Sequence, residues 1–150
     1  MKKFISILLL IIWLIIIFAF SNQTGEISGS ASNGILYNIF ENIYELFNLN
    51  KDNLVNFVNI IENPLRELMH SFEYFVLTIL SLNVLINFNI QNKIIILIMF
   101  IFIAASLDEI HQLFVPGRSF EYFDILMDMI GCFGFILICK VFNKNKILYW

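Results

Sequence analysis

The sequence predicts an all-α membrane protein, a bundle of four transmembrane helices with amphipathic interfacial helices between helices one and two. Of the 150 residues, 59% are hydrophobic and 14% are charged, whereas a soluble domain has about 25% charged residues. Four apolar stretches are each near the roughly 20 residues that span a bilayer. This composition excludes a soluble globular enzyme, a disordered chain and a disulfide-stapled secreted module. The net charge of −3 argues against a nucleic-acid partner.

The four apolar stretches give the expected transmembrane helices. They cover about 4–20, 66–87, 92–115 and 122–142, within a single domain of residues 1–150. The first run is longer than the 7–15-residue core of a signal peptide, which favours a retained helix. Pro116 and Gly117 give the third helix a natural stop. In the fourth helix, Gly131 and Gly134 allow a neighbouring helix to approach closely.

The segment at about 33–62 predicts amphipathic helices that lie at the outer membrane surface. Apolar residues recur there at helical spacing in two pieces, and Asn and Glu residues fill the opposite face. The apolar residues are Ile35, Leu36, Ile39, Phe40, Ile43, Leu46 and Phe47 in the first piece, and Leu54, Phe57, Val58 and Ile61 in the second. The alternative is that these helices cap the bundle by ordinary packing. Residues 21–33, rich in Ser, Gly and Asn, are expected to form a flexible lead-in.

The basic residues predict the orientation in the membrane. Cytoplasmic loops carry an excess of Lys and Arg. With four spans, one side receives Lys2, Lys3, Lys93, Lys140, Lys144 and Lys146. The other side receives only Lys51, Arg66 and Arg118. We therefore expect a multi-pass protein of the cytoplasmic membrane with both termini in the cytoplasm, and with the 21–65 segment and the 108–121 turn outside.

Polar and ionisable residues gather at the outer ends of the helices. Spacings of i, i+4 and i+7 place many of them on single helix faces. The candidate cluster comprises Ser21 and Gln23 after helix one, Arg66, His70 and Glu73 on helix two, Asp108, Glu109 and Gln112 on helix three, Arg118 in the turn, and Asp124 and Asp128 on helix four.

Helix lengths place several of these groups below the outer surface. Residues 94–107 span about 21 Å at 1.5 Å per residue, less than the roughly 30 Å of the hydrocarbon core. A carboxylate at mid-membrane costs about 2.5–3.5 kcal/mol, so we expect the cluster to face the bundle interior and to be functional. The alternative is a buried ion network that only fixes helix register.

The residues of the cluster suggest three functions. The first is a binding or modulating protein, in which Arg66 and Arg118 hold the phosphate or carboxylate of an amphiphile, although Arg118 alone is also compatible with a headgroup anchor. The second is an intramembrane enzyme with His70 and Glu73 as general acid and base, but no motif places a nucleophile. The third is a proton-coupled transporter, against which the cytoplasmic half is almost purely apolar. A metal site of His and carboxylates is a weaker variant because its signal is unspecific; we expect no metal and no cofactor.

Three runs of residues resemble VanZ-like membrane proteins. Residues 66–74, RELMHSFEY, look like the family's helix-two signature. Residues 108–118, DEIHQLFVPGR, followed by Asp124, Asp128 and Gly131, look like its second and more specific signature. Residues 20–23, FSNQ, are similar to the short motif after helix one. The resemblance covers nearly the whole chain.

Three positions depart from the family pattern. Asn22 replaces a frequent Ser, Glu67 stands where a basic residue is frequent, and Asp128 replaces a frequent Asn. The last two alter the local charge balance.

What the resemblance implies is a role in the cell envelope rather than a reaction. The family is named for a member associated with low-level resistance to teicoplanin, a lipoglycopeptide that acts outside the cytoplasmic membrane. The expected partners are membrane lipids, a lipid-linked wall precursor or a lipoglycopeptide, bound at the outer leaflet.

Overall fold

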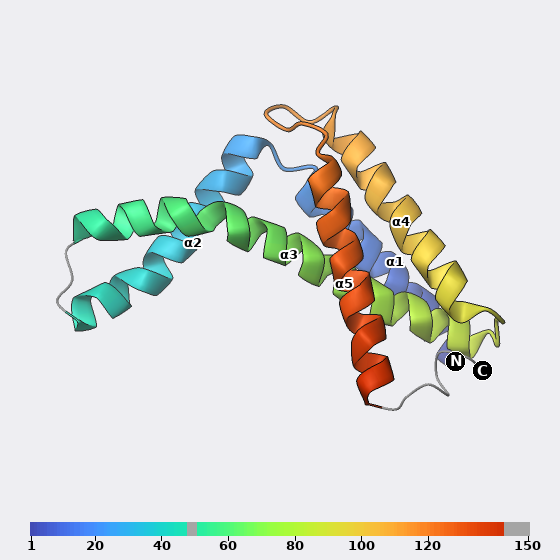
Figure 1. Cartoon of the computed structure of the whole chain (residues 1–150). Coiled ribbons are helices and arrows are strands. Elements are labelled where there is room, and N and C mark those ends of the chain that lie inside the picture. The colour runs from blue at the N-terminus through green and yellow to red at the C-terminus, as the bar shows by residue number, and fades with distance from the viewer. Residues whose placement is uncertain (48–50, 143–150) are drawn as a thin grey trace.

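The computed structural model describes residues 1–47 and 51–142, and this part of the chain is helical with no β-strand. Five helices follow one another: α1 (Lys2–Ser21), α2 (Gly25–Leu46), α3 (Lys51–Asn87), α4 (Lys93–Gln112) and α5 (Tyr122–Val141) (Figure 1). Four segments are long and apolar enough to cross a membrane: Lys2–Ser21, Asn53–Asn87, Lys93–Gln112 and Tyr122–Val141. The predicted all-α class and its four spans are therefore confirmed, and the chain is a multi-pass membrane protein.

Helix α3 is the centre of the bundle, because it packs against each of the other four helices. The main core lies where α3 meets α1, α4 and α5. Its fully buried side chains include Tyr74, Leu77, Ile101 and Cys132. The second cysteine, Cys139, is also buried, and neither cysteine forms a disulfide within the described part of the chain. The outward-facing sides of the four spans are covered by exposed apolar side chains, as expected for a surface in contact with lipid.

Helices α3 and α5 approach each other closely at Gly131. A Cβ atom placed on Gly131 would overlap the backbone carbonyl oxygen of Ser71 and lie 2.9 Å from the backbone nitrogen of Phe75. The Ser71 hydroxyl donates a hydrogen bond to the Met127 carbonyl at 2.6 Å. The predicted close approach is thus found at Gly131, whereas Gly134 has open space around it.

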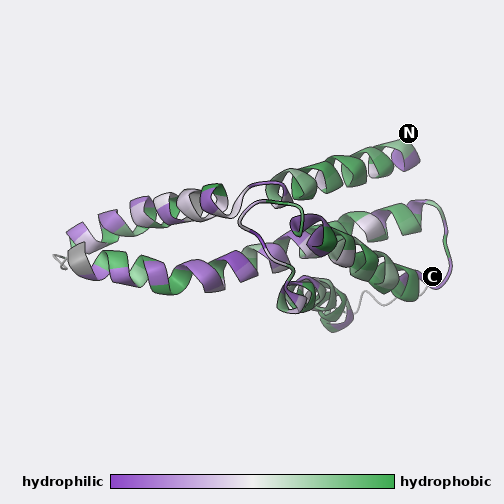
Figure 2. Cartoon of the chain, turned by 90° about the horizontal axis from the view of Figure 1, so that it is seen from above, coloured by the Kyte–Doolittle hydropathy of each residue, from purple (hydrophilic) through white to green (hydrophobic). Residues whose placement is uncertain are grey.

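Helix α2 and the first half of α3 form a hairpin that extends away from the bundle, which we call the arm (Figures 1 and 2). Leu36 of α2 is buried against Leu54 and Val58 of α3. The rings of Phe40 and Phe57 meet edge to face, with centroids 5.1 Å apart.

The prediction of a flexible lead-in over residues 21–33 is wrong, because α2 begins at Gly25. Its start is capped by Thr24, whose hydroxyl accepts a hydrogen bond from the Ile27 amide at 3.4 Å. Glu26 adds a favourable negative charge to the first turn. These local signals outweigh the Ser- and Gly-rich composition of the segment.

The second amphipathic piece and the second span are one helix and not two. Helix α3 continues through Pro64, although proline removes the hydrogen bond to the carbonyl of Ile60. Residues on both sides of Pro64 face α2, since Val58 packs on Leu36 and Leu65 lines a cavity together with it. This common partner keeps the two halves in one continuous helix.

The loop after α4 folds over the start of α2. Helix α4 ends at Gln112 and not at 115, and the chain turns through Gly117, whose φ of +76° favours glycine. The Gly25 amide donates a hydrogen bond to the Pro116 carbonyl at 3.3 Å. The C-terminal ends of α1 and α4 and the N-terminal ends of α2 and α5 therefore meet at one end of the bundle.

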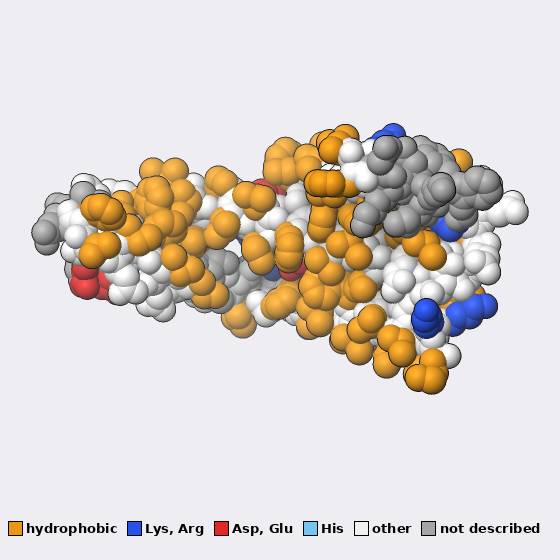
Figure 3. Space-filling model, turned by 90° about the horizontal axis from the view of Figure 1, so that it is seen from below, with side chains coloured by type: hydrophobic (Ala, Val, Ile, Leu, Met, Phe, Trp, Pro, Cys, Tyr) orange, Lys and Arg blue, Asp and Glu red, His pale blue; other side chains and the backbone are white. Residues whose placement is uncertain are grey.

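Lysines mark the opposite end of the bundle. Lys2, Lys3, Lys93 and Lys140 lie at the helix ends there, and the Lys3 ammonium lies 5.0 Å above the Phe88 ring. Figure 3 shows the basic side chains on its face at the end away from the arm. Lys144 and Lys146 lie outside the described residues. Which end faces the cytoplasm stays a prediction from the lysines.

Candidate functional site

A cavity of about 350 Å³ opens between the end of α1, the arm and the loop after α4. Its volume is within the range of roughly 300–1,000 Å³ typical of small-molecule sites. The apolar lining residues are Phe20, Ile35, Leu36, Leu65 and Met69. The polar ones are Gln23, Ser28, Glu62, Arg66, His70, Glu73 and Arg118. We call this the arm cavity; its mixed lining suits a molecule with an apolar part and a charged part.

One face of α3 supplies most of the polar lining. Glu62, Arg66, His70 and Glu73 follow one another at helical spacing, so they form a stripe along that face. The His70 Nδ1 and the Glu73 Oε2 are 3.9 Å apart. This stripe includes the predicted face of helix two and adds Glu62, which the sequence analysis placed in the interfacial segment.

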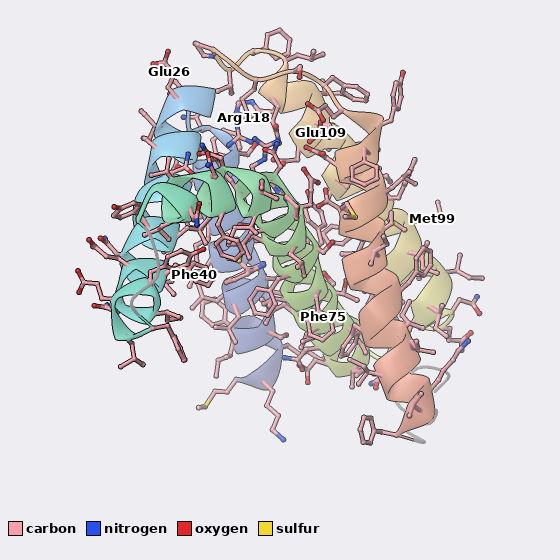
Figure 4. All side chains as sticks on the ribbon, turned by 60° about the vertical axis from the view of Figure 1, so that its left-hand side comes forward. Glu26, Phe40, Phe75, Met99, Glu109 and Arg118 are labelled. Atoms are coloured by element: carbon pink, nitrogen blue, oxygen red, sulfur yellow. The ribbon has the colours of Figure 1, made fainter. Side chains whose placement is uncertain are left out.

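Arg118 faces this stripe from the loop, although it is 45 positions or more away in sequence from each of the stripe's residues. Its Nε donates a hydrogen bond to the Gln23 carbonyl at 3.2 Å, and its Nη1 donates one to the Gln112 Oε1 at 3.2 Å. Figure 4 shows the labelled Arg118 at the end of the bundle where the loop folds over. Residues at the ends of α1 and α4 therefore hold this guanidinium at the wall of the arm cavity.

Buried acids lie next to the cavity, deeper in the bundle. Glu109, Gln112, Asp124 and Asp128 are all at most 5% exposed. The Glu109 Oε2 accepts a hydrogen bond from the Glu121 amide at 2.9 Å, which ties α4 to the start of α5. As their i, i+4 spacing predicted, Gln112 donates to the Asp108 Oδ2, at 3.3 Å. These residues face the bundle interior, as predicted.

A second, polar cavity of about 60 Å³ lies between the arm cavity and the buried acids. Arg66 and Arg118 line it, as they line the arm cavity, and so do Gln112 and Asp124. The Asp124 Oδ1 is buried and has no hydrogen-bond partner in the described part of the chain. The two arginines thus lie between buried acids on one side and the arm cavity on the other.

Glu67 lies beside these arginines and acids, and the sequence analysis did not include it in the candidate cluster. Its side chain lies beside Arg66, with 3.8 Å between the Arg66 Nη2 and the Glu67 Oε1. Its carboxyl group also lies next to that of Asp124, across the α3–α5 interface. Its signal in the sequence was the acidic residue at a position where the family frequently has a basic one.

Another groove, of about 390 Å³, lies between α1, α3 and α4 and is almost wholly apolar. Asp108 and His111 lie at its polar end, where the His111 ring is 4.6 Å from the Phe18 ring. Trp13 of α1 donates a hydrogen bond to the Glu73 carbonyl at 3.0 Å, so it does more than fill space.

The structure therefore divides the predicted cluster among four places. Gln23, Arg66, His70, Glu73 and Arg118 line the arm cavity. Glu109, Gln112, Asp124 and Asp128 form the buried layer, Asp108 lies in the apolar groove, and Ser21 is buried at the end of α1. Among residues 1–47 and 51–142, no group of three or more His, Cys, Asp or Glu side chains is arranged to hold a metal ion.

Comparisons with known proteins agree with the resemblance seen in the sequence. The model of the family described as VanZ/LLP1 matches residues 5–143. Searches of curated proteins and of solved structures gave no match. Because the family model covers nearly the whole chain, this multi-pass membrane protein belongs to the VanZ/LLP1 family.

Proposed function

We propose that the protein binds an amphiphile with an anionic head group at the outer leaflet of the cytoplasmic membrane, with the head group in the arm cavity. The observation that carries this proposal is the pair of arginines, Arg66 and Arg118, in a cavity whose other walls are largely apolar. Guanidinium groups match phosphate and carboxylate in a forked, bidentate geometry. The apolar wall leaves room for the first part of a lipid tail.

The hydrogen bonds of the two arginines support this proposal. Arg118 uses its Nε and Nη1 to hold its position, and neither of these two bonds involves Nη2. The buried Nε of Arg66 has no partner in the described part of the chain. An unpaired buried donor costs about 1–3 kcal/mol, which an anionic oxygen of the ligand would recover.

The surface of the arm supports a location in the outer leaflet. Figure 3 shows hydrophobic side chains that continue from the bundle along the arm on one face. In α2 they recur as an exposed stripe of Ile27, Ile35, Ile39, Ile43 and Leu46. Polar side chains fill the rest of the exposed surface of α2. Such a helix lies in the membrane interface with its apolar side in lipid, which gives a ligand lateral access to the cavity.

An amphiphile site of this kind fits an envelope role. A phospholipid, a lipid-linked wall precursor and a lipoglycopeptide each combine an apolar chain with an anionic or polar head. A contribution to teicoplanin-type resistance is thus a proposal that rests on the family name and on the chemistry of the arm cavity.

The direct test is lipid binding by purified protein with one arginine replaced. Native mass spectrometry with phosphatidylglycerol added to the detergent-solubilised protein counts the lipids bound. We expect Arg66→Gln and Arg118→Gln each to weaken binding by about tenfold or more, since each loses a charge-assisted contact. Lys140→Gln is the matched control, because it removes one positive charge at the opposite end of the bundle.

The outcome that contradicts the proposal is binding by both arginine variants equal to that of the Lys140→Gln control. Melting temperatures of all three variants separate lost binding from lost folding. A lipid count that falls equally in all three would mean that overall charge alone attracts the lipid, and this also contradicts a defined site.

A further inference from the structure

We infer that the head group bound in the arm cavity carries a protonated amine beside its anionic group, so that the ligand is a phospho-amine amphiphile. The inference rests on the proposed function and specifies the chemical class of its ligand. It comes from Glu62, an acid in the cavity wall that the binding of an anion leaves unexplained.

Glu62 and Arg66 lie one helical turn apart on the same face of α3. A separation of four residues corresponds to about 6 Å of rise along the helix. Both side chains line the arm cavity. The ion pair that Arg66 forms is with Glu67 on the side of the buried layer and not with Glu62. A carboxylate and a guanidinium are therefore both presented to the cavity, one turn apart.

The position of the Glu62 carboxylate is set by α2. A Cβ atom built on Gly29 would lie 3.3 Å from the Glu62 Oε1, so this oxygen is already close to the backbone of α2. A side chain at position 29 would compete for this space. Glu62 is half-buried, and its Oε1 lies on the side of α3 that faces α2.

The cavity wall carries ionisable groups of both signs. Arg66 and Arg118 are basic, and Glu62 and Glu73 are acidic. Glu73 lies 3.9 Å from His70, whereas Glu62 lies one turn from Arg66 on the same face of α3. A purely anionic head group held by the arginines would be repelled by Glu62 one turn away. An ammonium group at the same place turns this repulsion into a charge-assisted hydrogen bond.

The spacing suits a short linker between the two charged groups. In a phosphoethanolamine head, two carbons separate the phosphate oxygen from the ammonium nitrogen. This places the two charges within about one helical turn of each other, the separation of Arg66 and Glu62 along α3. An amino sugar attached to a lipid phosphate offers the same two groups and is recognised by the same chemistry.

The test is a competition between two lipids with identical acyl chains. Phosphatidylethanolamine and phosphatidylglycerol are added in equal amounts to one sample, and native mass spectrometry gives the ratio bound. We expect the wild type to prefer phosphatidylethanolamine. Glu62→Gln should reduce this preference about tenfold, the factor that corresponds to one charge-assisted hydrogen bond. Because both lipids share one sample, a partly unfolded fraction leaves the ratio unchanged.

The matched control is Glu26→Gln, which removes an exposed negative charge from the arm outside the cavity. Its ratio should equal that of the wild type. A wild type that prefers phosphatidylglycerol, or a Glu62→Gln variant with an unchanged ratio, would overturn the inference. If Arg66→Gln weakens both lipids while Glu62→Gln leaves the ratio unchanged, the proposed function stands and the inference fails. If Arg66→Gln weakens neither, the proposed function itself fails.

Discussion

Replacing Gly131 by alanine is expected to separate α3 and α5, the two helices that carry most of the ionisable residues of the predicted cluster. The added Cβ atom would overlap the Ser71 carbonyl oxygen, which belongs to the backbone of α3 and cannot rotate away. Helix α5 must then shift, and the 2.6 Å hydrogen bond from the Ser71 hydroxyl to the Met127 carbonyl is lengthened or lost.

The expected cost has two parts. Overpacking of a tight contact costs about 1–3 kcal/mol, and a lost hydrogen bond costs about 0.5–1.5 kcal/mol. Gly131→Ala should therefore lower the free energy of unfolding by about 1.5–4.5 kcal/mol, measured by titration of the micelle-bound protein with SDS. The higher helix propensity of alanine offsets up to about 1 kcal/mol of this loss.

Gly134→Ala is the control in the same helix, because a Cβ atom there has nothing within 4 Å. It should leave stability unchanged or raise it by up to about 1 kcal/mol. Equal stability of the two variants would refute the close approach of α3 and α5 at Gly131.

Three further predictions concern the orientation, the arm and α1. A cysteine at Ser119 should react with a membrane-impermeant reagent added outside intact cells, and one at Gln91 should not; the reverse pattern would overturn the orientation. A polarity-sensitive fluorophore attached at position 39 of the arm should report a lipid environment, and one at position 42 should report water. The reason is that Ile39 belongs to the apolar stripe and Asn42 to the polar face of α2. Equal emission spectra at the two positions would contradict an interfacial arm. Trp13→Phe should lower the free energy of unfolding by about 1 kcal/mol, because it removes the hydrogen bond to the Glu73 carbonyl of α3. An unchanged free energy of unfolding in the SDS titration would argue against that bond.

The sequence predicted the spans well because their signal is local and strong. A stretch of about 20 predominantly apolar residues permits few alternatives in a chain this poor in charge. The arm was not predicted as part of the second span, because its amphipathic pattern differs from the apolar stretch that follows, and because proline usually ends a helix. What overrides this local rule is packing of both halves against α2, which no residue in α3 reveals by itself.

The site was predicted as a set of residues and not as an arrangement. Helical spacing correctly grouped Arg66, His70 and Glu73, since neighbours on one helix face follow from the period alone. The position of Arg118 depends on how the loop folds over the end of α1. Its place beside α3 is therefore set by tertiary packing and does not follow from helical spacing. Glu67 lies next to Asp124 across a helix interface that sequence spacing does not specify.

The central claim is that the arm cavity holds an anionic amphiphile, and site-specific photo-crosslinking in the native membrane tests it most directly. A photoreactive methionine analogue at Met69 lies in the cavity wall, and one at Met99 of α4 is comparably exposed outside it. We predict that the adducts at position 69 are enriched in phosphate-bearing lipids relative to those at position 99, and that Arg118→Gln removes this enrichment. Adducts of the same composition at both positions would contradict the claim.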